Sequence, residues 1–222
     1  MSTHGFSDVG KDPPVSESID MRSEAAEVNA STNNELRLDI AANRAGRKWS
    51  RKELAGRFMW KLAHPLFAWS PRICWGWRRF MLRCFGARIG RDVHIYPSVR
   101  IAVPWNLDIG DQSAIGDHAI LYSLGLVRLG RQVTLSQHAH ICAGTHDHTK
   151  PDMPLVKAPV TIGDGAWICA DAFIGPGVQI GAEAIVGARC VVMKDVEPTA
   201  IMIGNPAKLL RWRAHGMNHD GS

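Results

Sequence analysis

An aliphatic residue returns at every sixth position over about half of the chain. Positions 162, 168, 174, 180, 186 and 192 are all Ile or Val. The same period, interrupted by short insertions, runs from Ile89 to Ile141, and a small or β-branched residue stands four positions after each aliphatic one. A helix has a period near 3.6 and a strand a period of two, so neither explains the pattern. A repeat this short cannot bury its own core, which predicts a stack of similar units.

Each six-residue unit predicts a short strand and a turn, with the aliphatic residue and the small residue pointing inward. Glycine often follows the aliphatic residue, where we expect it to allow a tight turn. Three units close a triangular coil, and successive coils stack at about 4.8 Å. The expected fold is an all-β solenoid, a parallel β-helix of about five coils. The coils begin near Ile89, Ile109, Leu129, Ile162 and Ile180, and the first two carry bulges around Asn106–Asp108 and Leu126–Arg128.

The period stops between the third and fourth coils. Residues 147–159 show no repeat and contain three prolines, so this segment is expected to leave the stack as a loop. We therefore predict a β-helix domain over residues 89–211, a basic, tryptophan-rich helical segment over residues 45–88, and a tail over residues 1–44. Residues 1–40 carry eight acids, three bases and few apolar side chains, a composition typical of disorder.

Residues 41–91 have the opposite charge, with thirteen bases and the single acid Glu53. A capping box at Ser50–Glu53 predicts one helix, and three- and four-residue spacings of apolar residues predict another over Cys74–Phe85. Five of the eight tryptophans lie in residues 47–88. This segment can cap the open first coil, pack on a neighbouring subunit, or lie on the anionic surface of the inner membrane. Nucleic acid is not indicated, because a basic patch without a motif is weak evidence.

Other features bear on where the chain works. No stretch of 18 apolar residues and no signal-peptide pattern is present, so we expect neither a membrane span nor secretion. The five cysteines, Cys74, Cys84, Cys142, Cys169 and Cys190, show no paired spacing. An odd number without a framework favours reduced thiols and a cytoplasmic location, with possible attachment at the membrane face.

Four histidines, His138, His140, His146 and His148, lie close together in the sequence. His146 stands where the period breaks and the loop departs, a position that favours a cleft. An imidazole there can remove a proton from a hydroxyl group. A zinc enzyme like the β-helical carbonic anhydrases is an alternative that requires three converging ligands. A third possibility is a non-catalytic scaffold.

The motifs around His146 resemble those of the maltose, galactoside and nodulation-type hexapeptide O-acetyltransferases. They are Thr145-His146-Asp147-His148, the run from Pro159 to Ile168, Gly175-Pro176-Gly177, Val191–Asp195 and Gly204–Lys208. Residues 76–80 and 104–107 are similar to those of the colanic-acid-biosynthesis branch. The resemblance covers about residues 75–211 and implies a left-handed coil, a homotrimer with sites between subunits, and acetyl transfer from acetyl-CoA to a sugar hydroxyl in exopolysaccharide or cell-surface glycan biosynthesis, with no metal required.

The resemblance also implies roles for individual residues. His146 is the catalytic base, and Trp167 lines the tunnel in which the pantetheine arm meets the acceptor. The other cofactor-binding positions are Ala170 and Ala188, which contact the pantetheine amides, and Met193, Lys194, Lys208 and Arg211 at the nucleotide phosphates. Acceptor-side candidates are Tyr122, Ser123 and Asp147, the last also able to orient His146. Ser123 stands where relatives have Asn, and Cys169 replaces a usual Gly, most simply as a small apolar filler.

Overall fold

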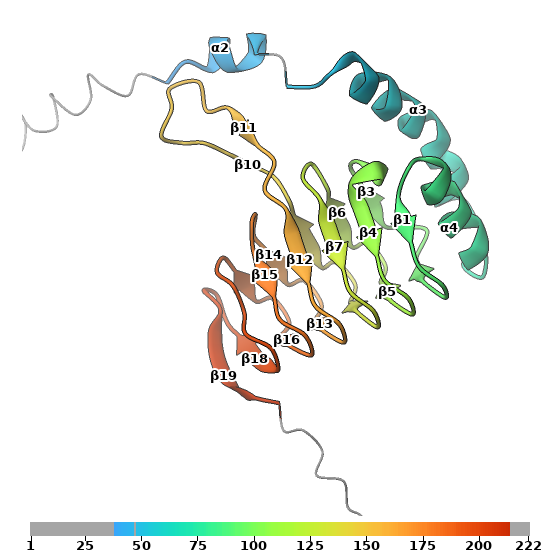
Figure 1. Cartoon of the computed structure of the whole chain (residues 1–222), viewed down its shortest axis with the longest axis vertical. Coiled ribbons are helices and arrows are strands. Elements are labelled where there is room, and N and C mark those ends of the chain that lie inside the picture. Colours follow the sequence, from blue (N-terminus) through green and yellow to red (C-terminus); the bar gives the residue numbers. More distant parts are fainter. Residues whose placement is uncertain (1–37, 47, 214–222) are drawn as a thin grey trace, which may run out of the picture.

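The six-residue period folds into a parallel β-helix of three sheets, shown in Figure 1. The computed structural model describes residues 38–46 and 48–213. Sheet A contains β1 (Arg88–Ile89), β4 (Leu107–Ile109), β7 (Val127–Leu129), β12 (Val160–Ile162) and β15 (Gln179–Ile180). Sheet B contains β2 (His94–Ile95), β5 (Ala114–Ile115), β8 (Thr134–Leu135), β13 (Trp167–Ile168), β16 (Ile185–Val186), β18 (Ala200–Ile203) and β19 (Lys208–Trp212). Sheet C contains β3 (Arg100–Ile101), β6 (Ile120–Tyr122), β9 (His140–Cys142), β14 (Phe173–Ile174) and β17 (Val191–Val192).

The coil count exceeds the expected five by an incomplete sixth coil. Val196 pairs with Ile180 as an isolated parallel bridge, and β18 pairs in parallel with β16. The six-residue period did not predict this coil, because Val196 follows Ile180 after 16 residues, whereas Ile180 follows Ile162 after 18. After β18 the chain reverses, and β19 pairs with it in antiparallel fashion. The end of the stack is therefore partly covered by its own chain.

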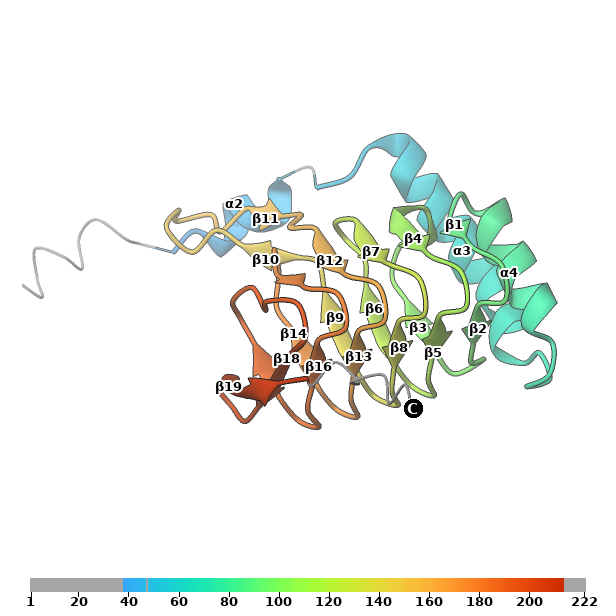
Figure 2. The ribbon, with the colours of Figure 1, turned by 60° about the horizontal axis from the view of Figure 1, so that its bottom comes forward.

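Every insertion into the period lies at one corner, between sheets C and A. The first contains a 3₁₀ turn, Pro104–Asn106, and the second covers residues 123–126. Both lie slightly before the expected bulges, because β4 and β7 already occupy residues 107–109 and 127–129. The third insertion is the long segment, which forms a β-hairpin of β10 (Thr145–His146) and β11 (Leu155–Val156). We call residues 145–156 the arm, and Figures 1 and 2 show it extending from the stack.

The glycines that directly follow the aliphatic residues allow neighbouring coils to stack closely. A Cβ on Gly110 would lie 2.5 Å from the carbonyl oxygen of Gly130, and one on Gly163 would lie 2.6 Å from the nitrogen of Ala182. The left-handed backbone falls two residues later, at residues such as Asp92 (φ 52°) and at Gly165 (φ 66°). Glycine directly after the aliphatic residue does not supply the positive φ of the turn. It instead lets neighbouring coils approach.

Among the described residues, three helices precede the coils: α2 (Ile40–Ala45), α3 (Arg51–Ala68) and α4 (Trp75–Cys84). The capping box of Ser50 and Glu53 is confirmed at the start of α3. Residues 40–44 were expected within a disordered tail but belong to α2, whereas residues 1–37 of that tail lie outside the described residues. In the part of the chain that the structure describes, no helix has both the length and the apolar character needed to cross a bilayer.

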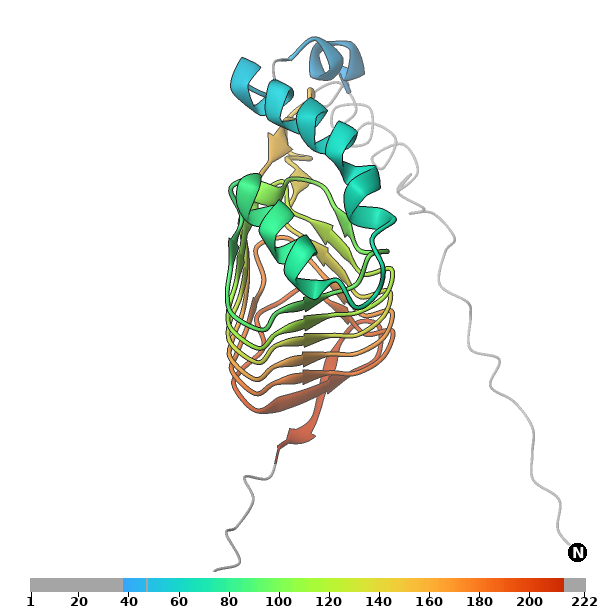
Figure 3. The same ribbon diagram turned by 90° about the vertical axis from the view of Figure 1, so that its right-hand side faces the viewer.

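Helices α3 and α4 cover the end of the stack where carbonyl groups lack partners, as Figure 3 shows. The N–H groups of Gly90, His94, Tyr96 and Ala102 donate to carbonyls of the second coil, and the corresponding carbonyls of the first coil have no preceding coil to supply a backbone donor. Side chains of the helices that can only donate hydrogen bonds bind these carbonyl oxygens: Arg83 donates to Ile89, Arg79 to Val93, Arg78 to Ile95 and Trp60 to Ile101. The prediction that the basic, aromatic segment caps the first coil is confirmed for these residues.

We predict that Arg78→Met lowers the free energy of unfolding by roughly 2–4 kcal/mol, because several carbonyls would lose a charged donor. The Arg78 side chain is fully buried and donates to the carbonyls of Ile95, Pro71 and Arg72. Chemical denaturation measures the change. The control is Arg88→Met, whose side chain is 82% exposed and which should change stability by less than about 0.5 kcal/mol. Equal effects of the two substitutions would contradict the capping role.

Candidate active site

The arm holds His146 in a defined orientation. Its Nδ1 lies 2.7 Å from the carbonyl oxygen of Met153, across the hairpin that pairs His146 with Leu155. A carbonyl can only accept a hydrogen bond, so Nδ1 carries the proton in the neutral ring and Nε2 keeps its lone pair. The side chain is exposed to solvent. His146 is therefore oriented as a base whose reactive nitrogen is open to a ligand.

Asp147 stabilises the turn of the arm and does not orient His146. Its Oδ1 accepts hydrogen bonds from the Thr149 hydroxyl at 2.5 Å and the Thr149 backbone N–H at 3.1 Å. Lys150 lies 3.6 Å from the other carboxylate oxygen. The bond from the Thr149 hydroxyl is the main reason that the pKa of Asp147 is lowered from its ordinary value. The acceptor role expected for Asp147 stays a prediction.

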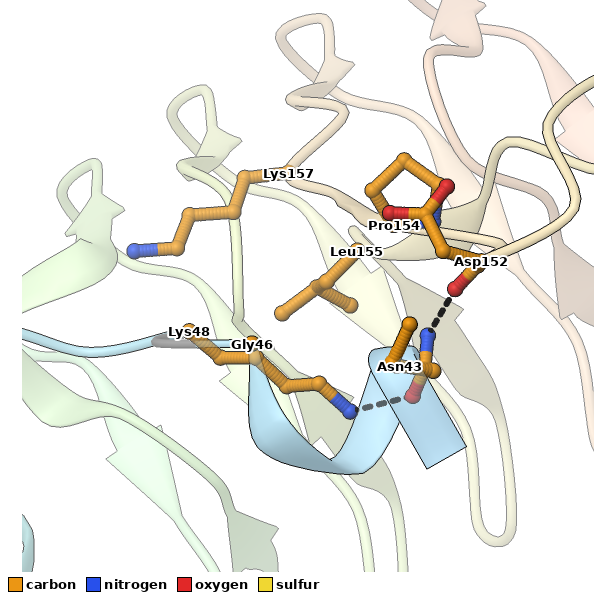
Figure 4. A pocket seen from close by; sticks show the side chains of 8 residues that line it. Asn43, Gly46, Lys48, Asp152, Pro154, Leu155 and Lys157 are labelled. Carbon is orange, nitrogen blue, oxygen red and sulfur yellow. Dashed lines mark hydrogen bonds between the residues drawn. The ribbon is translucent and has the colours of Figure 1, made fainter. Parts of the chain in front are cut away.

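Helix α2 fixes the carbonyl group that orients His146. The Asn43 amide nitrogen donates to the carbonyl oxygens of Asp152 at 2.5 Å and Met153 at 2.6 Å. The Met153 oxygen therefore receives donors from both Asn43 and His146. Figure 4 shows Asn43 reaching Asp152 beside a pocket between α2 and the arm. The short helix thus belongs to the machinery that positions the arm.

A second attachment ties the arm to α3. Lys157, which follows β11, lies 3.0 Å from the carboxylate of Glu53 and 4.4 Å from the ring centroid of Trp49. Arg57 lies 4.1 Å from the same ring. The backbone hydrogen bond at Ser50, together with Lys157, lowers the pKa of Glu53 to about 2. This acid therefore stays ionised at any physiological pH and keeps the arm attached.

The residues expected at the cofactor lie on a different part of the coil. Strand pairing places Trp167, Ile185, Ile201 and Arg211 in one row along the outer face of sheet B. The row spans three strand spacings, or about 14 Å. Trp167 is 47% exposed, and its indole N–H donates to the Ser136 hydroxyl at 2.9 Å. The row thus joins an oriented indole to a cation across an apolar surface.

The remaining cofactor candidates flank this row. Ala170 and Ala188 occupy equivalent places on successive coils at the corner between sheets B and C, where the Arg189 N–H donates to the Ala170 carbonyl. Met193 and Lys194 follow β17 and are exposed. A hydrogen bond of 2.9 Å from Ala207 to Val191 brings the start of β19, with Lys208, to the end of β17. The structure therefore gathers these candidates toward the C-terminal end of the stack.

The burial of Cys169 and Ser123 decides what their side chains can do. Cys169 is partly buried, and desolvation raises the pKa of its thiol, which does not favour a thiolate nucleophile. Ser123 is fully buried, where its hydroxyl donates to the Val103 carbonyl and accepts from the Val103 N–H. Ser123 therefore stabilises the C–A corner and does not offer its hydroxyl to an acceptor. Tyr122, its neighbour, is 40% exposed at that corner.

A single chain does not bring His146 and Trp167 together. His146, Asp147 and Tyr122 lie at the corner between sheets C and A, whereas Trp167 lies on sheet B. In a triangular coil, sheet B is the face opposite that corner. Figure 1 shows the arm on one side of the stack and β13 and β16 on the other. Within one chain, His146 and the row from Trp167 to Arg211 therefore lie on different sides of the coil.

Three contributors were missed in the sequence. Asn43 lay in the expected tail, and Met153 contributes only a carbonyl group, which no residue pattern reveals. No sequence signal marks Ser136, whose hydroxyl accepts the indole N–H. The equivalent place on sheet B varies and holds Tyr96, Gly116, Cys169 and Gly187 in the other coils. Within residues 38–46 and 48–213, no three His, Cys, Asp or Glu side chains are grouped as metal ligands would be.

The chain is similar to known acetyltransferases. Residues 159–194 match the family model "Bacterial transferase hexapeptide (six repeats)". The colanic acid biosynthesis acetyltransferase WcaF of Escherichia coli K12 is 42% identical over 154 residues, which cover 69% of this chain and 85% of WcaF. The chain belongs to the hexapeptide-repeat acetyltransferase family.

Solved members of this family share the fold. The maltose O-acetyltransferase of Clostridium difficile 630 is 22% identical with a TM-score of 0.69, covering 82% of this chain and 100% of that one. A galactoside acetyltransferase in complex with coenzyme A has the same identity and TM-score, with coverages of 79% and 91%. The expected left-handed β-helix is thereby confirmed. In the chain described here, α2 and α3 support the arm.

We predict that Asn43→Ala accelerates amide hydrogen exchange in β10 and β11 by roughly five- to thirtyfold, because the arm loses two hydrogen bonds to α2. Mass spectrometry of exchanged peptides measures this change. Arg44→Ala, an exposed substitution on the same helix, is the control and should leave the arm unchanged. Unchanged exchange in Asn43→Ala would show that α2 does not support the arm.

Proposed function

We propose that the protein transfers an acetyl group from acetyl-CoA to a hydroxyl group of a sugar in exopolysaccharide or cell-surface glycan biosynthesis. The observation that carries this proposal is the orientation of His146, with Nδ1 on a backbone carbonyl and Nε2 open. Membership of the acetyltransferase family supplies the reaction class. The similarity to WcaF and to galactoside O-acetyltransferase, whose names give colanic acid and a galactoside, supports a sugar acceptor.

In the proposed reaction, Nε2 of His146 removes the proton of the acceptor hydroxyl as its oxygen attacks the thioester carbonyl carbon. The resulting tetrahedral intermediate expels the thiolate of coenzyme A, which takes the proton back from the imidazolium. The acetyl group passes directly to the acceptor without an acyl-enzyme. The Met153 carbonyl stabilises the imidazolium during the transfer, because it accepts the hydrogen bond from Nδ1.

The row from Trp167 to Arg211 suits acetyl-CoA. Ile185 and Ile201 offer an apolar path for the pantetheine arm, and Ala170 and Ala188 leave room beside it. Lys194, Lys208 and Arg211 supply cations for the phosphates, with Met193 next to them. The exposed indole of Trp167 lies at the other end of the path, where the thioester would meet the acceptor.

We further propose a homotrimer in which the arm of one chain reaches the cofactor row of the next. The opposite positions of His146 and Trp167 require a second chain. The outer face of sheet C also favours association, because Ile120, Phe173 and Val191 follow one another along it. Burial there lowers the pKa of the intervening His140, which contacts Phe173 edge to face. Sheet A presents the ion pairs of Asp108 instead.

The acceptor side comprises Tyr122 and the arm with Asp147, and a cytoplasmic location fits the unpaired cysteines of the described chain. The zinc alternative draws on the same histidines, but the family relationship and the single oriented imidazole favour acyl transfer. A scaffold without activity would have no use for the double support of the Met153 carbonyl.

We predict that His146→Ala slows acetyl transfer by about 10²–10⁴-fold, because the acceptor hydroxyl loses its base. The dissociation constant of acetyl-CoA should change by less than about twofold, since the cofactor contacts lie elsewhere. A thiol-release assay and calorimetry measure the two quantities. His148→Ala, exposed on the same arm, is the control and should keep full activity. Full activity in His146→Ala, or loss of wild-type activity on chelation, would favour the alternatives.

A mixing experiment tests the shared site. His146→Ala and Trp167→Ala should each be inactive alone as homotrimers. Co-expressed, they should form trimers with about a quarter of the interfaces intact, and hence about a quarter of wild-type activity. A site within one chain would restore nothing, because every chain would carry one defect. Light scattering should give three times the chain mass of 24.4 kDa, and a monomer would overturn the trimer.

A further inference from the structure

Helix α3 has two apolar faces, of which only one packs on the coils. Trp60 and Phe67 are buried against the first coil. On the outer side, Leu54, Phe58, Leu62 and Leu66 recur at four-residue spacing and are 52–62% exposed. Large apolar side chains in a regular row on the solvent side are unusual for an ordinary surface helix. The row therefore marks an interaction surface.

The surface continues past the end of α3 onto α4. Trp69 and Ile73 in the connection are 84% and 83% exposed. The Trp77 indole N–H donates to the Leu66 carbonyl at 3.1 Å, which joins the two helices, and the Trp77 ring lies 6.0 Å from that of Phe80. We call this surface the outer apolar face: Leu54, Phe58, Met59, Leu62, Leu66, Trp69, Ile73, Trp77 and Phe80. Figure 3 shows α3 and α4 together at one end of the stack, and no other described residue covers the side away from the coils.

Positive charges border the outer apolar face. Arg51, Lys52 and Lys61 on α3 are exposed. The only acid of α3 is Glu53, which is bound to Lys157 on the arm side. Helix α4 contains no acid. The surface thus combines leucine, phenylalanine and tryptophan with cations and lacks neighbouring negative charge.

We propose that the outer apolar face docks on the surface of an anionic lipid bilayer, with α3 lying parallel to the membrane. Apolar side chains would enter the boundary of the acyl chains, tryptophans would lie at the headgroups, and the bordering cations would contact lipid phosphates. The charge favours this occupant, because a second copy of the face would bring equally cationic borders together. The docking depends on neither His146 nor the proposed acceptor.

The test is flotation of the full-length protein with vesicles of phosphatidylcholine alone or mixed with phosphatidylglycerol. Wild type should float with the anionic vesicles and bind the neutral ones at least roughly tenfold more weakly. Phe58→Glu should lose at least roughly tenfold in partitioning, because a charge enters the apolar boundary. Leu210→Glu, an equally exposed apolar site on β19, is the matched control and should bind as wild type.

A second pair of measurements separates docking from misfolding and self-association. Lys52→Gln combined with Lys61→Gln should weaken binding to the anionic vesicles only, and circular dichroism should show all variants folded. Light scattering should give the same mass for Phe58→Glu as for wild type. The proposal is overturned if wild type does not float, if Phe58→Glu floats like wild type, or if Phe58→Glu changes the oligomeric state while binding persists.

Discussion

The capping of the first coil's free carbonyl groups is the interaction on which the rest of the structure depends. In the second coil the carbonyls of Ile109, Ser113, Ile115 and Leu121 accept N–H groups from the first coil, but their counterparts in the first coil have no preceding coil to supply a donor. These carbonyls need hydrogen-bond donors, and arginine and tryptophan side chains supply donors without adding acceptors that would need partners themselves. Three of the arginines before the coils, Arg78, Arg79 and Arg83, and one tryptophan, Trp60, meet this need. The exposed charges of α3 remain outside this requirement.

The functional geometry depends on the same stack. Fixed strand spacing sets the row from Trp167 to Arg211, while the C–A corner releases the arm on the opposite side. Helix α2 and the start of α3 then hold the arm at Met153 and Lys157. The N-terminal helices therefore link two tasks, closure of the stack and orientation of the base, in one continuous segment. A change that loosens one is expected to disturb the other.

The coils were predictable from the sequence because buried positions recur with a fixed period, and the departure of the arm was predictable from its prolines. The incomplete sixth coil was not, since two residues fewer before Val196 break the period while pairing continues. His146 stood out through its place at the break. Ser123 was expected on the acceptor side, but its hydroxyl is hydrogen-bonded to backbone groups of Val103. Asn43 acts through a carbonyl whose position depends on the fold of the arm. Contacts between distant segments leave no local pattern.

The three corners of the coil differ in how freely their length can vary. At the A–B and B–C corners, residues such as Asp92 and Asp171 adopt left-handed backbone. The number of residues from one strand to the next at these two corners stays constant through the described coils. At the third, successive coils carry a short turn, another short turn, the arm and then no insertion. Segments can therefore be lengthened or exchanged at this corner without shifting the register of the core. Under the proposed function, the acceptor contacts of the arm can therefore vary while the register of the coils is kept.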